Sequence, residues 1–207
     1  MIISTLYCVL FCIFALTFIY IILLKLEKAL EILKNGGVIL YPTDTIWGIG
    51  CDATNVEAIN KIFEIKKREK TKSMIILVEN ERRLQDLVDV PEMAWQIIDL
   101  SEKPVTIVYE NPKNLPKEIL AEDGSIGIRL VKDDFCNKLI SKLNKPLVST
   151  SANFSGDKSP LKFSDISQEL IDAVDYAVEE NRESVSKYSG SSVIKVWSDG
   201  RVKVLRE

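Results

Sequence analysis

Hydrophobic residues follow two alternating patterns along this chain: helical spacing and short continuous apolar runs. Apolar residues at helical spacing predict a short amphipathic helix over 26–34. Gly36 and Gly37 are typical of a helix end, because glycine adopts the left-handed conformation at little cost. The apolar run 38–41 then predicts a buried strand, which Pro42 ends because it cannot donate to a ladder.

The same alternation continues to the end of the chain. Thr54-Asn55-Val56-Glu57 has the form of a capping box and predicts a helix that ends near Arg68. We predict further helices over 81–88, 92–100, 133–143 and 165–178, and strands over 74–78, 105–109, 126–131, 147–150, 191–197 and 201–205. Ser198-Asp199-Gly200 joins the last two strands and is typical of a hairpin, so we expect an α/β fold with a mixed sheet.

Composition narrows the chemistry. The 207 residues, 46% hydrophobic and 28% charged, predict one domain of moderate size with a real core. The net charge of −3 gives no bulk attraction to nucleic acid. The chain has no histidine, which excludes Ser-His-Asp and Cys-His nucleophilic sites and every histidine-ligated metal. The four cysteines have neither zinc-site nor disulfide spacing, so we expect reduced thiols and a cytoplasmic protein.

Residues 1–24 form an uncharged apolar segment that is long enough to cross a bilayer as a helix. Two interpretations stay open. The segment is an uncleaved membrane anchor, and Lys25, Lys28 and Lys34 then place the remainder on the cytoplasmic side. Alternatively, the start codon is assigned too far upstream, and the folded domain does not need the segment. In either case we predict that residues 26–207 form the functional domain.

A first candidate site lies directly after the strand at 38–41. Thr43, Asp44 and Thr45 put two hydroxyls and a carboxylate at its carboxyl end, where open α/β sheets usually bind ligands. Gly48 and Gly50 predict close approach of the backbone to a ligand.

Three polar clusters add candidate chemistry. A basic cluster, which could also be a solvated helix end, suits a triphosphate because lysine and arginine meet phosphate oxygens with charge-assisted hydrogen bonds. It contains Lys66, Lys67, Arg68, Lys70 and Lys72. A hydroxyl-rich cluster follows a buried strand and contains Ser149, Thr150, Ser151 and Asn153. The third pairs Ser125 with Arg129 on an apolar strand, where an arginine requires an anion or carboxylate.

Five motifs occur in a fixed order. They are PTDTIWGIG, the Lys66-x-Arg68 pair, residues 125–129, residues 149–156, and residues 191–194. In this order, over 26–207, the chain resembles the YrdC-like L-threonylcarbamoyladenylate synthase family. The resemblance implies a YrdC-like twisted mixed sheet with flanking helices and a concave basic face. It also implies synthesis of threonylcarbamoyl-AMP and pyrophosphate from L-threonine, bicarbonate and ATP with Mg²⁺. That product would pass to the machinery that makes N6-threonylcarbamoyladenosine in tRNA.

The resemblance also implies residue roles. Threonine contacts would come from Thr45, Arg129 and Ser149. ATP contacts would come from Lys66, Arg68, Lys72, Ser125, Ser151, Asn153, Ser159 and Arg206, of which Lys66, Arg68, Ser151 and Asn153 carry the catalytic signature. The sequence departs from the family pattern at Glu69, where proline is usual, in Lys72-Ser73-Met74, and at Trp47, where tyrosine is commoner.

Two alternatives remain. A basic concave face could grip double-stranded RNA by its backbone without catalysis, although the net charge is negative and the basic cluster lacks interleaved aromatics. The related carbamoyl-transfer domain of hydrogenase maturation belongs to long chains with zinc-finger cysteine pairs, which this sequence lacks. For the synthase, approximation of three reactants and neutralisation of phosphate charge suffice, so no protein nucleophile and no general base are needed.

Overall fold

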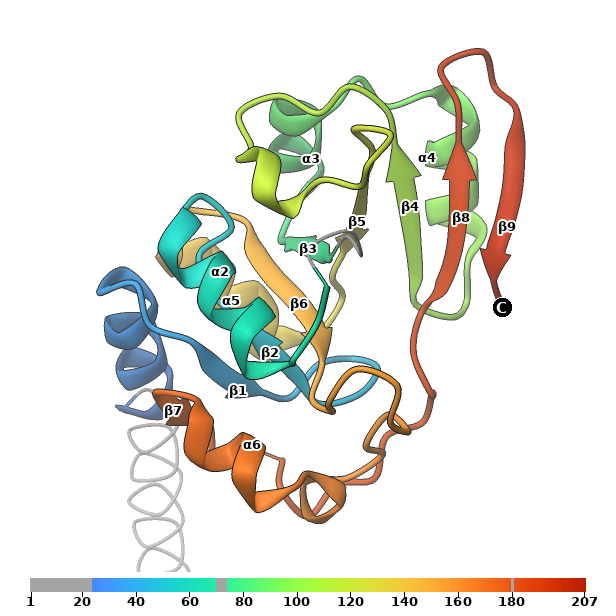
Figure 1. Ribbon diagram of the computed structural model, residues 1–207. Helices are drawn as coiled ribbons and strands as arrows, with labels where there is room; N and C mark the ends of the chain where they lie inside the picture. The colour runs from blue at the N-terminus through green and yellow to red at the C-terminus, as the bar shows by residue number, and fades with distance from the viewer. Residues whose placement is uncertain (1–23, 70–73, 180) are drawn as a thin grey trace, which may run out of the picture.

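A single mixed β-sheet organises the chain (Figure 1). The structure is a computed structural model, and it describes residues 24–69, 74–179 and 181–207. Within those residues the sheet has nine strands, in the order β7 (Tyr176–Ala177), β1 (Ile39–Tyr41), β2 (Gly48–Gly50), β6 (Leu147–Ser151), β3 (Ile75–Val78), β5 (Ile126–Leu130), β4 (Val105–Tyr109), β8 (Ser192–Val196) and β9 (Val202–Arg206). The β1–β7, β3–β5 and β4–β8 pairs are parallel and the others antiparallel, which confirms the predicted mixed α/β sheet.

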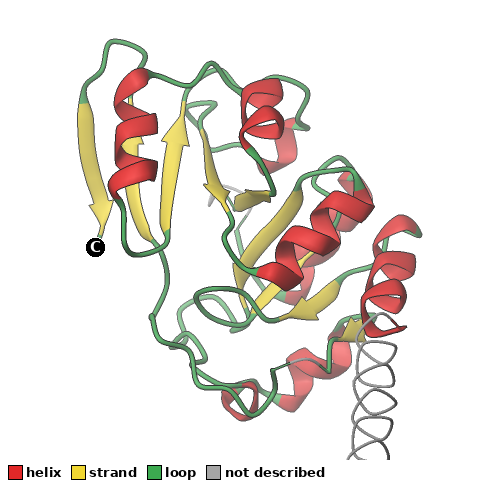
Figure 2. Cartoon of the chain, turned by 180° about the vertical axis from the view of Figure 1, so that it is seen from behind, coloured by secondary structure: helices red, strands yellow, loops and turns green. Residues whose placement is uncertain are grey.

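Helices cover the sheet (Figures 1 and 2). Residues 24–34 are helical, followed along the chain by α2 (Val56–Ile65), α3 (Glu81–Leu87), α4 (Glu92–Leu100), α5 (Asp134–Leu143) and α6 (Gln168–Ala173), with short 3₁₀ turns at Lys117–Ile119 and Phe163–Asp165. Alternate residues of β1 belong to different hydrophobic clusters. Leu40 packs in the cluster that contains α2, and Ile39 and Tyr41 pack in the one that contains α5. Because both faces of β1 are buried, its sequence is a continuous apolar run.

Two sequence predictions about helix ends are wrong. The N-cap of α2 is Asn55, whose side chain accepts from the amide of Ala58 at 3.0 Å, rather than a box begun by Thr54. The Thr54 hydroxyl instead donates to Asp52 Oδ1 at 2.7 Å. The predicted helix over 165–178 is also too long, because α6 ends at Ala173 and the chain then becomes strand β7. Pairing with β1 overrides the local helical pattern there.

The two glycines of the first motif lie in a strand, not in an open loop. A Cβ on Gly50 would lie 2.3 Å from the carbonyl oxygen of Val148 and 2.7 Å from the ring of Tyr41. Gly50 is therefore required for close packing between β2, β6 and Tyr41, and the prediction that it approaches a ligand is wrong. Gly48, by contrast, does line the cavity described below.

The apolar segment predicted over 1–24 lies outside the described residues except for Leu24. In the part of the chain that the structure covers, we find no helix both long and apolar enough to span a bilayer. Cys51 and Cys136 are buried free thiols, as the sequence predicts.

Candidate active site

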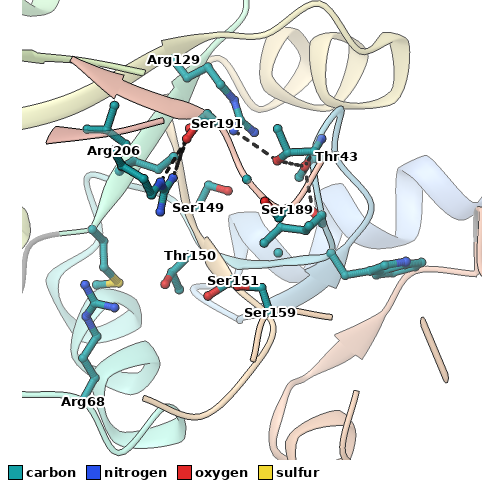
Figure 3. Close-up of a pocket in the computed structure, with 18 residues that line it drawn as sticks. Thr43, Arg68, Arg129, Ser149, Thr150, Ser151, Ser159, Ser189, Ser191 and Arg206 are labelled. Carbon is teal, nitrogen blue, oxygen red and sulfur yellow. Dashed lines mark hydrogen bonds between the residues drawn. The ribbon is translucent and has the colours of Figure 1, made fainter. Parts of the chain in front are cut away.

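The residues at the ends of β1, β5, β6 and β9 surround a cavity of about 220 Å³, which we call the main cavity (Figure 3). Hydroxyl residues singled out from the sequence line it, among them Thr43, Thr45, Ser149, Thr150 and Ser151. Arg68, Arg129, Ser159 and Arg206 line it as well. Segments distant in sequence therefore converge on one cavity rich in arginine and hydroxyl groups.

Arg129 is the most deeply buried cation of the main cavity, with 3% of its surface exposed. Its Nη2 lies 3.0 Å from Asp44 Oδ1, and its Nη1 donates to the Thr45 hydroxyl at 3.3 Å. Among the residues that the structure describes, its Nε has no hydrogen-bond partner. A buried donor without a partner is costly. Arg129 also lines the main cavity, so its guanidinium places a positive charge where an anion could bind.

The carboxylate of Asp44 completes this pair. Burial raises the pKa of Asp44, and the charge of Arg129 opposes that rise. Asp44 lies in the stretch that follows β1, so the fold brings a carboxylate from one motif to an arginine from another. The sequence predicts an anion or a carboxylate at Arg129, and Asp44 is that carboxylate.

The hydroxyl-rich cluster lies on β6 and the loop after it. Ser149 is buried, and in the antiparallel ladder it pairs with Ile75, while Ser151 pairs with Gly48. This pairing holds the end of β6 against β2, and both serines line the main cavity. Ser159, from the following loop, lines it too (Figure 3).

Arg68 and Lys66, the basic pair of the sequence motif, lie in different environments. Arg68 lines the main cavity, and burial lowers the pKa of its guanidinium. Lys66 does not line the main cavity: it is 1% exposed, and its Nζ donates to the carbonyl oxygens of Ser151 and, at 2.6 Å, Asn153. Burial, with a smaller contribution from the charge of Arg68, lowers the pKa of Lys66 to about 7.

Asn153 likewise points into its own loop, because its side-chain amide donates to the carbonyl oxygens of Phe154 and Asp157. Lys67 turns outward, with its backbone in the left-handed region at φ 49° and its Nζ 2.9 Å from Glu169 Oε1. Lys72, the remaining predicted phosphate contact, lies outside the described residues.

Arg206, on the last strand, reaches back into the main cavity. Its Nε and Nη2 donate to the carbonyl oxygen of Ser191 at 3.1 and 2.8 Å. The Ser191 hydroxyl in turn shares a 2.7 Å hydrogen bond with Thr106. Burial, and to a smaller extent the charge of Arg129, lower the pKa of Arg206. Arg68, Arg129 and Arg206 thus concentrate positive charge in this cavity.

Ser125 lies elsewhere. It lines a second cavity of about 600 Å³, which we call the neighbouring cavity and which shares Ile75 and Val193 with the main one. The Ser125 hydroxyl donates to Asp123 Oδ1 at 2.5 Å. Hydrogen bonds from Lys195 and Ser125 lower the pKa of Asp123 to about 2.

Comparison with known proteins shows the family to which the chain belongs. The profile of the Sua5/YciO/YrdC family, which carries the description telomere recombination, matches residues 31–207. This chain belongs to the Sua5/YciO/YrdC family. It is 34% identical over 186 residues to a putative threonylcarbamoyl-AMP synthase of Methanocaldococcus jannaschii, covering 87% of this chain and 86% of the relative. It is 31% identical over 159 residues to the threonylcarbamoyl-AMP synthase of Pseudoalteromonas translucida, covering 75% and 85%.

Solved structures show the same fold. The structure of P. abyssi Sua5 with two substitutions has a TM-score of 0.73 at 25% identity, over 83% of this chain and 50% of Sua5. This chain therefore spans about half the length of that protein. E. coli YciO has a TM-score of 0.74 at 24% identity, over 88% of both chains. At this level of identity, the likeness to YciO shows a shared fold and no more.

The sequence assigned no function to some of the residues that line this site. Ser189, Gly190 and Ser191 line the main cavity. Of these, only Ser191 belongs to a motif named from the sequence, the one at 191–194, and that motif gave it no role. Asp44 stands out in the motif after β1, yet its partner Arg129 becomes visible only when β5 is folded beside it. Thr43 instead bonds within its own motif, to Thr45 and to the carbonyl oxygen of Ile46.

Proposed function

We propose that this member of the Sua5/YciO/YrdC family is an L-threonylcarbamoyladenylate synthase. The reaction joins L-threonine, bicarbonate and ATP into threonylcarbamoyl-AMP, with release of pyrophosphate. The names of the two relatives that share more than 30% of their residues with this chain support the proposal. The observation that carries it is Arg129, a buried guanidinium with a partnerless Nε beside a hydroxyl-lined cavity.

The amino acid fits the end of the main cavity formed by Arg129, Thr45 and Ser149. Arg129 would donate to the α-carboxylate through charge-assisted hydrogen bonds, which are the stronger class in proteins. Thr45 and Ser149, both buried, would contact its polar groups. In Sua5 of P. abyssi, L-threonine is the ligand of one crystal structure.

The triphosphate would lie in the same cavity, beside the amino acid. Arg68 and Arg206 supply positive charge, and Ser151 and Ser159 supply hydroxyl donors. The neighbouring cavity with Ser125 adjoins this region through Ile75 and Val193, and it offers room for the nucleoside. We assign Lys66 and Asn153 to holding the loop after β6, and the role of Lys72 in ATP binding stays a prediction from the resemblance.

Mg²⁺ would enter the site with the nucleotide, as Mg-ATP. Among the described residues that line the main cavity there is no carboxylate, so phosphate oxygens, rather than protein ligands, would hold the ion. Its contribution is to neutralise charge on the phosphates. The residues of the chain bind and orient the reactants around it.

The chemistry proceeds by approximation. The amine of threonine attacks the carbon of bicarbonate, forming a C–N bond and losing water to give a carbamate. A carbamate oxygen then attacks the α-phosphorus, and the bond to the β-phosphate oxygen breaks with release of pyrophosphate. Fixed guanidinium and hydroxyl groups stabilise charge that develops on the phosphates.

The test is pyrophosphate release by the full-length chain. We expect release only when L-threonine, bicarbonate and Mg-ATP are all present. Pyrophosphate release that is unchanged when threonine or bicarbonate is left out would contradict the proposal. Salt-sensitive binding of double-stranded RNA without turnover would favour the binding-module alternative instead. The product would pass to a tRNA threonylcarbamoyl-transfer system.

A further inference from the structure

The hydroxyl of Thr43 is fully used inside the protein. It donates its proton to the carbonyl oxygen of Ile46 at 2.8 Å. It also accepts from the amide of Thr45 at 3.1 Å, and its oxygen lies 3.0 Å from the hydroxyl oxygen of Thr45. A hydroxyl has one proton and two lone pairs. Since the proton of Thr43 goes to Ile46, the bond between the two threonines must be donated by Thr45.

This assignment fixes the polarity of Thr45. Its only hydroxyl proton goes to Thr43, and one of its two lone pairs accepts from Nη1 of Arg129 at 3.3 Å. Within the described chain, the second lone pair has no partner. Thr45 lines the main cavity, in which Figure 3 labels its two partners Thr43 and Arg129. A ligand in that cavity therefore meets the Thr45 hydroxyl as a hydrogen-bond acceptor.

We propose that Thr43 is a positioning residue that sets this polarity, and that the group received by Thr45 is the α-amino group of the substrate amino acid. The inference rests on the proposed function and deepens it. Thr43 would act on the substrate through Thr45 without touching it, because its own donor and acceptor sites are filled.

The pairing with Arg129 supports an amino acid over other small anions. Arg129 lines the main cavity with a guanidinium that can only donate, and the acceptor of Thr45 lies 3.3 Å from its Nη1. An α-amino acid carries an acceptor, its carboxylate, and a donor, its amino group, on one carbon. The order of donor and acceptor in the site is thus complementary to that of the ligand.

The arrangement also suits the reaction. Thr45 would hold one N–H of the neutral amine, which leaves the nitrogen lone pair available to attack the carbon of bicarbonate. If the Thr45 proton were free, the hydroxyl could turn and donate to that lone pair, and the amine would then be held in the wrong orientation. Thr43 prevents this by engaging the proton.

The experiment measures dissociation constants by ligand-observed NMR on the full-length chain, with L-threonine and with 3-hydroxybutyrate, which lacks the amino group. We expect Thr43→Val to weaken L-threonine binding about fivefold to tenfold, as for one hydrogen bond. Binding of 3-hydroxybutyrate should not change. Thr43→Ser keeps the hydroxyl and should bind both ligands like the wild type.

Comparing L-threonine with 3-hydroxybutyrate distinguishes the proposed role of Thr43 from a purely structural one. A purely structural role of Thr43 would weaken both ligands equally, and that result, or unchanged binding of both, would overturn the inference. Wild-type protein that does not bind L-threonine would instead overturn the proposed function.

If Thr43→Val does not fold, the inference can be tested by comparing two further ligands on the wild-type protein. There, 2,3-dihydroxybutyrate, whose 2-hydroxyl can donate to Thr45, should bind more tightly than 3-hydroxy-2-oxobutyrate, whose 2-oxygen only accepts. Equal binding of those two ligands would overturn the inference.

Discussion

The ammonium nitrogen of Lys66 lies 2.6 Å from the main-chain carbonyl oxygen of Asn153 and also donates to that of Ser151. This contact joins the C-terminal end of α2 to the loop after β6. The amide of Ser155 donates back to the carbonyl oxygen of Lys66 at 3.2 Å. The two motifs are thereby one structural unit, and Lys66 fixes the loop that carries Ser151.

The stability of the protein should therefore depend on the protonation of Lys66. Burial lowers its pKa from 10.5 to about 7 in the fold, so between these values the unfolded chain binds the proton more tightly. The free energy of unfolding should rise with pH through this window, whereas below it Lys66 is protonated in both states. Urea unfolding of the wild type and of Lys66→Met should show a flatter pH dependence in the variant.

The control for that measurement is Lys67→Met, which removes a neighbouring but exposed ammonium. It should leave the pH dependence of the unfolding free energy as in the wild type. Equal slopes for Lys66→Met and the wild type would show that Lys66 does not carry this pH dependence.

Arg129→Met should destabilise the fold as well as abolish threonine binding. The variant leaves the Asp44 carboxylate largely buried without its ion pair, a loss of about 3 kcal/mol in comparable pairs. Adding Asp44→Asn removes the unpaired charge and should recover part of the unfolding free energy, but no threonine binding. Recovery of binding in the double variant would argue against Arg129 as the carboxylate contact.

Arg68→Ala should lower ATP-dependent activity by about one to two orders of magnitude, because charge-assisted hydrogen bonds contribute roughly 1.5–3 kcal/mol each. The fold should remain intact by circular dichroism. Lys67→Ala is the matched control, since Lys67 is adjacent but pairs with Glu169 outside the cavity. Similar activities for the two variants would mean that the basic cluster is only a solvated helix end.

Gly50→Ala should lower the free energy of unfolding by about 3 kcal/mol, because its Cβ would lie 2.3 Å from a backbone oxygen that cannot easily move. At Gly48 the nearest atom to an added Cβ is the Ser149 hydroxyl oxygen, at 3.3 Å. Gly48→Ala should therefore lower the midpoint of thermal unfolding less than Gly50→Ala does. The reverse order would refute the packing argument for Gly50.

Much of the fold could be predicted from sequence, because local pattern and tertiary environment agree in most elements. The run 38–41 reads as a buried strand since both faces of β1 are covered. Strand β7 could not be predicted, because Tyr176 and Ala177 become a strand only by pairing with β1. Their local sequence continues the helical pattern of α6.

The site was predictable to the level of motifs rather than of atoms. The family resemblance implies that Thr45, Arg129 and Ser149 contact one ligand, and the structure brings all three to the main cavity. Sequence could not show that Lys66 turns away from the cavity, because its partners are backbone carbonyls. The polarity of Thr45 was hidden for the same reason, since it depends on the carbonyl of Ile46.

The most direct test of the central claim follows the carbon of bicarbonate into the product. Full-length protein would be incubated with Mg-ATP, L-threonine and ¹³C-labelled bicarbonate, and the adenylate analysed by mass spectrometry. We expect threonylcarbamoyl-AMP carrying one labelled carbon, with an equal amount of pyrophosphate. An adenylate of threonine without the label, or no adenylate from a folded protein, would contradict the account.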